Sequence, residues 1–247
     1  MIPKKIHYVW LGGSNKGTVV ENNIAQWRML LPDYEFVEWT EQAYLNVFGE
    51  DIPKYLLSAI EARQWAFASD YIRLKVLETF GGVYLDTDVE LLTSLDKFLI
   101  NKSFIGMESR FAVSTAVIGS EKNVKWISEL LSLYEKRDFV SESGRMDKEP
   151  NSLYIYKYFK QINSDFDSDH AIPDLSVFKR DVFSPIDFMT GKLKKSDKTV
   201  AIHHFSGTWK NKSGKVKDFI IKLIFKFIGE DKYQNLKKLL KDVKRKW

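Results

Sequence analysis

The feature that most constrains the fold is a long helical pattern that ends at two glycines and leads at once into a short acidic strand. Apolar residues recur at helical spacing over residues 53–80, and the glycines at 81–82 predict an abrupt helix end. Residues 83–91 then read as a strand, on which Asp86 and Asp88 are expected to share one face. Two adjacent carboxylates at a strand end suit a hard divalent cation such as Mg²⁺ or Mn²⁺.

The rest of the chain alternates between short apolar runs and helical patterns. Strands are predicted at 6–11, 34–39, 83–91, 104–107, 115–119 and 199–204, and helices at 21–31, 40–48, 53–80, 124–134 and 151–161. A polar loop is expected at 137–150. This order predicts an α/β fold with a mixed, largely parallel sheet flanked by helices.

Asp-x-Asp alone leaves other interpretations open. The two acids could be exposed on an edge strand, or could belong to a haloacid-dehalogenase-like phosphotransferase. The latter pattern has Thr or Val two residues past the second aspartate, where this chain has Glu90. On the preceding helix, Asp70 and Arg73 are i, i+3 neighbours. They could form a surface ion pair, or could hydrogen-bond a polyhydroxylated ligand beside the acids.

Charge is divided unevenly along the chain. The net charge is +5, yet residues 210–247 hold thirteen Lys/Arg against four acids, a net of +9, which leaves −4 for residues 1–209. We therefore predict an acidic domain over 1–209, which the resemblance described below implies to be catalytic, and a tail of basic amphipathic helices over 210–247, suited to an anionic membrane surface. Nucleic acid is not expected as a partner.

Two absences narrow the classes further. The chain has no cysteine, which excludes disulfides, thiolate metal sites and a cysteine nucleophile. Neither a signal peptide nor a membrane-spanning run is recognisable, so the expected location is cytoplasmic, peripheral on the inner face of the cell membrane.

Three ordered motifs resemble the DXD-containing sugar-nucleotide glycosyltransferases. They are the opening strand Ile2-Pro3-Lys4-Lys5-Ile6-His7-Tyr8-Val9-Trp10, the central Ser69-Asp70-x-x-Arg73 with Gly81-Gly82-Val83-Tyr84-Leu85-Asp86-Thr87-Asp88, and the closing His203-His204-Phe205-Ser206-Gly207-Thr208-Trp209. The resemblance extends to small bacterial transferases of capsular polysaccharide and lipopolysaccharide, to fungal initiating mannosyltransferases, and to the catalytic domain of the large clostridial glucosylating toxins.

The resemblance implies a GT-A-type, Rossmann-like fold and a metal-dependent, retaining transfer of a hexose from a nucleotide sugar, with UDP expected as the nucleotide. The acceptor would be a saccharide of capsule or O-antigen, lipid-linked in some relatives. A non-catalytic sugar-nucleotide or glycan-binding protein of the same fold is the alternative.

The resemblance also assigns roles to individual positions. Trp10 would stack on the base, and Asp86, Asp88 and His204 would hold Mn²⁺ or Mg²⁺, with His203 as the other candidate histidine. The remaining donor-site positions are Ser69, Asp70, Arg73, Tyr84, Thr208 and Trp209.

Overall fold

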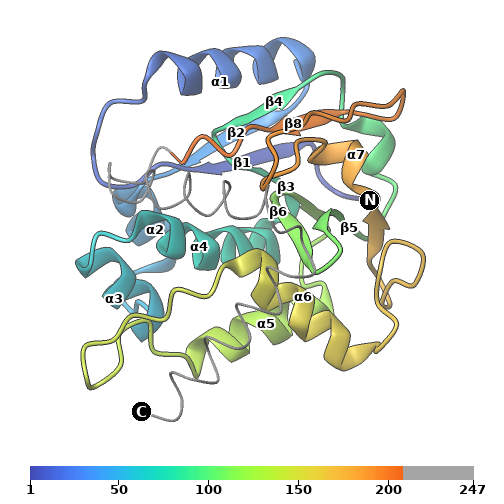
Figure 1. Ribbon diagram of the computed structural model, residues 1–247. Helices are drawn as coiled ribbons and strands as arrows, with labels where there is room; N and C mark the ends of the chain where they lie inside the picture. The colour runs from blue at the N-terminus through green and yellow to red at the C-terminus, as the bar shows by residue number, and fades with distance from the viewer. Residues whose placement is uncertain (208–247) are drawn as a thin grey trace.

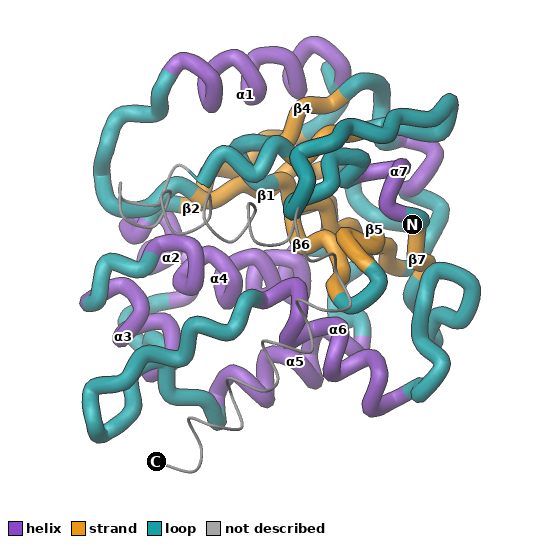
Figure 2. The backbone as a smooth tube through the Cα atoms, in the orientation of Figure 1, coloured by secondary structure: helices purple, strands orange, loops and turns teal. Residues whose placement is uncertain are grey.

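The computed structural model describes residues 1–207 (Figures 1 and 2). Thr208, Trp209 and the predicted amphipathic tail over 210–247 lie outside the described residues. Within residues 1–207, no helix is both long and apolar enough to cross a membrane.

A six-stranded sheet forms the centre of the fold, with strand order β2-β1-β3-β6-β5-β7. Its strands are β1 (Lys5–Val9), β2 (Glu35–Trp39), β3 (Gly82–Leu85), β5 (Ser103–Ser109), β6 (Ala112–Ser120) and β7 (Ser176–Phe178). Within this sheet β6 runs antiparallel to both of its neighbours, while the other pairs are parallel. The predicted mixed, mostly parallel sheet is therefore confirmed.

Helices and a second small sheet cover the two faces of this sheet (Figure 1). The helices are α1 (Thr18–Leu30), α2 (Glu41–Phe48), α3 (Lys54–Glu61), α4 (Trp65–Phe80), α5 (Lys125–Glu135), α6 (Asn151–Ile162) and α7 (Arg180–Phe183), with a 3₁₀ turn at Asp96–Phe98. Strands β4 (Val89–Leu91) and β8 (Ala201–His203) pair antiparallel as a separate two-stranded sheet.

Alternate residues of the central strands feed two hydrophobic cores. In β1, Ile6 and Tyr8 pack into the core under α1, β4 and α7. Val9 belongs to the opposite core, which α3, α4, α5 and α6 complete. Burial on both faces explains the nearly continuous apolar runs of these strands.

The glycine pair joins α4 to β3 at a crowded point. Gly81 and Gly82 have φ of 64° and 104°, and a Cβ on Gly82 would lie 2.6 Å from the carbonyl oxygen of Lys5. Only glycine fits such a backbone and such an approach. The buried His7 holds this turn, because its Nδ1 accepts from the Trp39 indole and its Nε2 therefore donates to the Gly81 carbonyl oxygen.

Two sequence predictions of single elements are wrong in the same way. The helix predicted at 53–80 is divided into α3 and α4 at residues 62–64, where Arg63 takes a left-handed φ of 52°. The strand predicted at 83–91 is divided into β3 and β4, which belong to different sheets. Between them the chain turns at Asp86, whose carbonyl oxygen accepts from the Val89 amide. The strand β7 and helix α7 were not predicted.

Candidate metal and substrate site

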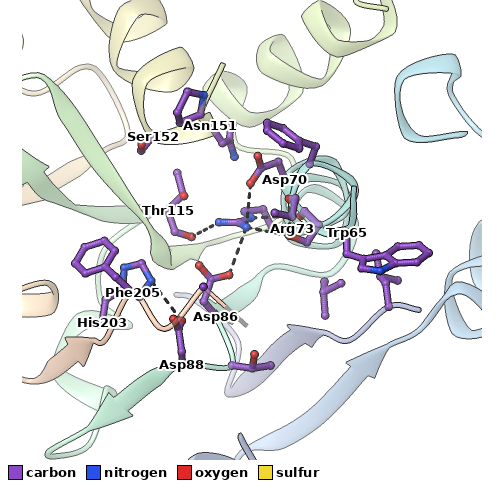
Figure 3. A pocket seen from close by; sticks show the side chains of 18 of the residues that line it. Trp65, Asp70, Arg73, Asp86, Asp88, Thr115, Asn151, Ser152, His203 and Phe205 are labelled. Atoms are coloured by element: carbon purple, nitrogen blue, oxygen red, sulfur yellow. Dashed lines mark hydrogen bonds and ion pairs between the residues drawn. The ribbon is translucent and has the colours of Figure 1, made fainter. Parts of the chain in front are cut away.

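A cavity of about 730 Å³ opens where β1, β3 and β5 end, between the start of α4 and the start of α6. Figure 3 shows its polar side chains, which come from segments far apart in the sequence. Both predicted aspartates line it, together with Asp70 and Arg73. The central predicted motif is thus brought to one cavity.

The Asp86-Thr87-Asp88 segment forms a turn rather than a strand, and α1 holds it from outside. Asn23 Nδ2 donates to the Thr87 carbonyl oxygen at 3.0 Å, and the buried Trp27 indole donates to the Val89 carbonyl oxygen at 2.9 Å. The prediction that alternation alone aligns Asp86 and Asp88 is therefore wrong, although the turn still directs both into the cavity.

Asp86 is held in place by groups from α4 and β3. Its Oδ1 accepts from the Tyr84 hydroxyl at 2.8 Å and lies 3.3 Å from Arg73 Nη2. Its other oxygen, Oδ2, accepts no hydrogen bond from any described residue. One oxygen is thus fixed by the protein while the second stays available to a ligand.

Arg73 is a buried cation between two carboxylates. Its Nη2 lies 3.0 Å from Asp70, its Nη1 donates to the Thr115 carbonyl oxygen at 2.8 Å, and its guanidinium lies 4.7 Å from the centre of the Tyr84 ring (Figure 3). Burial raises the pKa of Asp70 to about 7, although the charge of Arg73 opposes the shift. This pair is 11% and 5% exposed, so the surface ion pair considered from sequence is excluded.

Asp88 faces the closing motif instead. Its Oδ1 lies 3.3 Å from His203 Nε2, and its Oδ2 accepts from the backbone amide and the hydroxyl of Ser206 at 2.8 and 2.9 Å. Burial alone would raise the pKa of Asp88, but these bonds hold it well below its usual range. Strand pairing creates the arrangement, because Val89 of β4 is in register with His203 of β8.

Asp86, Asp88 and His203 form the candidate metal centre. One ligand atom from each lies within 4.8 Å of the others. Two carboxylates and an imidazole suit Mn²⁺ or Mg²⁺, and they leave room for phosphate oxygens. The predicted ligand His204 lies elsewhere: its side chain is 43% exposed and its Nε2 lies 2.8 Å from Glu90. Adjacent strand residues face opposite ways, so the third ligand position moves to His203.

Two tryptophans line the cavity, and Figure 3 shows Trp65 on the far side of Arg73 from His203 and Phe205. Trp10 lines the cavity, and its indole donates to the Ser14 carbonyl oxygen at 2.7 Å. Trp65, which the sequence analysis placed only as a helix residue, also lines the cavity and covers Gly12, where a Cβ would meet its ring at 2.7 Å. Ser69 lines it as well, and its hydroxyl accepts from Arg73 Nη2 at 3.2 Å.

Two polar residues of the cavity were missed from sequence. Asn151, the first residue of α6, is 4% exposed and its Oδ1 accepts from the Tyr134 hydroxyl. Glu108 lies near the end of β5, and burial raises the pKa of its carboxyl to about 7. The signal for Glu108 was the one charged residue of its strand, and for Asn151 a polar residue directly after Pro150 at a helix start.

Part of the chain matches a known family. Residues 17–105, which include Asp70, Arg73 and both aspartates, match the family described as "Glycosyltransferase sugar-binding region containing DXD motif". Trp10 and His203 lie outside the matched range.

Curated relatives are fungal. The chain is 26% identical over 133 residues to inositol phosphoceramide mannosyltransferase 3 of Schizosaccharomyces pombe, covering 53% of this chain and 36% of the relative. It is 31% identical over 114 residues to a mannosyl phosphorylinositol ceramide synthase of Saccharomyces cerevisiae, covering 45% and 30%. The chain thus spans about a third of the length of these relatives.

Solved structures support the architecture. The PaToxG glycosyltransferase superimposes with a TM-score of 0.52 at 20% identity, covering 68% of this chain and 71% of that one. At that identity the likeness establishes the fold, which is the GT-A type predicted from sequence.

Proposed function

We propose that the chain, whose residues 17–105 match the glycosyltransferase sugar-binding region containing the DXD motif, transfers a hexose from a nucleotide sugar to a saccharide acceptor. The observation that carries the proposal is the cluster of Asp86, Asp88 and His203 beside the buried Asp70–Arg73 pair in one cavity. A non-catalytic binder has no need of a metal site set against a buried ion pair. The phosphotransferase interpretation does not fit the family match.

The residues divide the donor between them. Asp86, Asp88 and His203 would hold a divalent cation that neutralises the charge developing on the departing nucleoside diphosphate. Asp70 and Arg73 orient the sugar through its hydroxyl groups, because both are fixed by each other and by surrounding bonds before any ligand arrives. Trp10, which lines the same cavity, would offer its ring to the base.

The finer assignments rest on resemblance. We propose retention of the anomeric configuration through attack on the face from which the diphosphate departs. UDP is the nucleotide expected from the bacterial relatives, with capsule or O-antigen as the product. The names of the fungal relatives point to mannose as the sugar and a glycolipid as the acceptor. We also propose a peripheral membrane location through residues 210–247, on the inner face of the cell membrane.

Thermal stabilisation and nucleotide release test the proposal together. The wild-type chain would be incubated with Mn²⁺ and, in turn, UDP-glucose, UDP-galactose, UDP-N-acetylglucosamine and GDP-mannose. We expect one of these donors to raise the melting temperature and to release its nucleoside diphosphate only when Mn²⁺ is present.

Replacement of one aspartate should then remove turnover. Asp88→Ala deletes a proposed ligand at the cavity mouth, and we expect release to fall by about 10³-fold or more while the circular dichroism spectrum stays unchanged. Glu78→Gln, which alters a carboxylate paired with Lys75 outside the cavity, is the matched control. Near-normal turnover by Asp88→Ala in the presence of EDTA would reject the metal-dependent function.

A further inference from the structure

Glu108 is a carboxylate of the cavity to which the proposed binding of the donor assigns no role. It lines the same cavity as the metal cluster. Its carboxylate accepts no hydrogen bond and forms no ion pair with any residue in 1–207, although Asp86, His203 and Arg180 act on it electrostatically. The nearby Arg180 is instead paired with Asp187 at 3.0 Å. A carboxylate that is partly withdrawn from water into a cavity, without a protein partner, is available to a ligand.

A β-bulge places Glu108 in the cavity. Met107 is in register with Val113 and Ser109 with Ala112, so Glu108 is the extra residue of β5 and has no partner on β6. Bulges re-aim single side chains and are frequent beside active sites. The distortion therefore favours a functional role for this residue over a packing role.

Glu108 also stands at the same edge of the sheet as the metal cluster. Strands β3 and β5 both run antiparallel to β6 and so are parallel to each other, with Asp86 following β3 and Glu108 near the end of β5. The strand between them contributes Thr115, whose carbonyl oxygen accepts from Arg73. The strand order β3-β6-β5 therefore places three features side by side at this edge. They are the aspartate turn after β3, the Thr115 contact to Arg73 on β6, and Glu108 on β5.

This position suits the acceptor rather than the donor. Glu108 is not one of the three residues whose ligand atoms cluster within 4.8 Å. A carboxylate repels a diphosphate, so a hydroxyl group is the natural partner. Because Glu108 lines the same cavity as the metal cluster and lies near the end of a strand parallel to β3, a hydroxyl bound to it would lie beside the diphosphate held by the metal.

We propose that Glu108 binds the attacking hydroxyl of the acceptor and takes its proton; this inference rests on the proposed function. In that step the hydroxyl oxygen forms a bond to the anomeric carbon of the donor sugar. The bond from that carbon to the phosphate oxygen breaks, and the nucleoside diphosphate leaves with the electron pair. The hydroxyl proton passes to the Glu108 carboxylate, and product release returns it to water.

Donor hydrolysis tests this without a known acceptor, since water can occupy the place of the hydroxyl. The measurement is nucleoside diphosphate release from the donor that stabilises the wild-type chain, compared among wild type, Glu108→Gln, Glu108→Asp and the control Glu78→Gln. We expect Glu108→Gln to lose about 10²-fold or more, because an amide cannot take the proton. Glu108→Asp should retain part of the rate, and Glu78→Gln all of it.

Two further readouts separate this role from a structural one. Thermal stabilisation by UDP or GDP with Mn²⁺ should be the same in Glu108→Gln as in wild type. The acidic limb of the pH–rate profile should become shallower in the variant, because only the ionisation of Asp70 then remains in it. A hydrolysis rate within threefold of wild type for Glu108→Gln would overturn the inference, as would loss of nucleotide binding. Absence of both stabilisation and turnover in the wild type on all four donors would instead reject the proposed function itself.

Discussion

Asp86 and Asp88 are two residues apart, yet they belong to two differently built halves of the cavity. The inner half comprises Asp70, Arg73, Tyr84 and Asp86, which all come from α4, β3 and the turn between β3 and β4. The outer half comprises Asp88, His203 and Ser206, and the bond between Ser206 and Asp88 joins positions 118 residues apart. The side chains of the inner half are therefore held together by opposite charges, whereas those of the outer half are brought together by the pairing of β4 with β8.

The largest effect is expected from the inner half. Arg73→Met leaves the buried Asp70 and the partly buried Asp86 without their shared cation, and such a loss costs about 3–5 kcal/mol of unfolding free energy. Urea unfolding measures it. The exposed Arg110→Met is the control and should change stability by about 0.5 kcal/mol or less.

A second variant keeps this prediction testable if Arg73→Met fails to fold. Adding Asp70→Asn to Arg73→Met removes one uncompensated charge and should recover part of the lost stability. If Arg73→Met unfolds within 1 kcal/mol of wild type, the inner half is not held by charge compensation and the comparison fails.

The next largest effect is expected from the outer half. His203→Ala removes a proposed metal ligand and should weaken Mn²⁺ binding by about 100-fold. Losing a residue that only orients a metal ligand typically costs about 10- to 100-fold in affinity, so losing a ligand itself should reach at least the upper value. His204→Ala removes only the contact to Glu90 and should leave Mn²⁺ affinity within about threefold. Calorimetric titration of Mn²⁺ into both variants measures the difference. If His204→Ala gives the larger loss, the pairing of Val89 with His203 does not select the ligand.

The smallest effect is the pH dependence of stability that Asp70 contributes in the inner half. The pKa of Asp70 is raised from its ordinary 3.8 to about 7 by burial, so the folded protein binds this proton more tightly than the unfolded chain. Its contribution to stability is therefore greatest below about pH 4 and declines as the pH rises toward 7. Asp70→Asn should lose less unfolding free energy between pH 5 and pH 8 than wild type does. Equal losses measured by urea unfolding would show that Asp70 is not responsible.

The same division explains what the sequence could predict. The inner half follows from local signals: helical spacing places Asp70 and Arg73 on one face, and the glycine pair returns the chain beside them. The outer half depends on the register of β4 with β8, which no local pattern encodes. For that reason the sequence favoured His204, whereas the structure groups His203, the other candidate, with Asp86 and Asp88.

The fold shows a parallel limit. The spacing of apolar residues located most of the helices and central strands. It did not show the break at Arg63 or the division of residues 83–91 between two sheets. The aspartate turn is fixed by a tertiary contact, since Asp86 donates its amide to the Ala116 carbonyl oxygen of a neighbouring strand. Glu108 was missed for a related reason, because a bulge is a property of two strands together.

The pairing of β4 with β8 also has a consequence for the order of events during folding. Residues 89–91 can pair only with residues 201–203, which lie more than 100 positions later in the chain. Closing so long a loop costs more conformational entropy than forming contacts between neighbouring elements. The inner half can form as soon as α4 and β3 are joined, so we expect the cation site to be among the last parts to mature. The time at which a refolding chain first binds Mn²⁺ would then report when the pairing of β4 with β8 is complete.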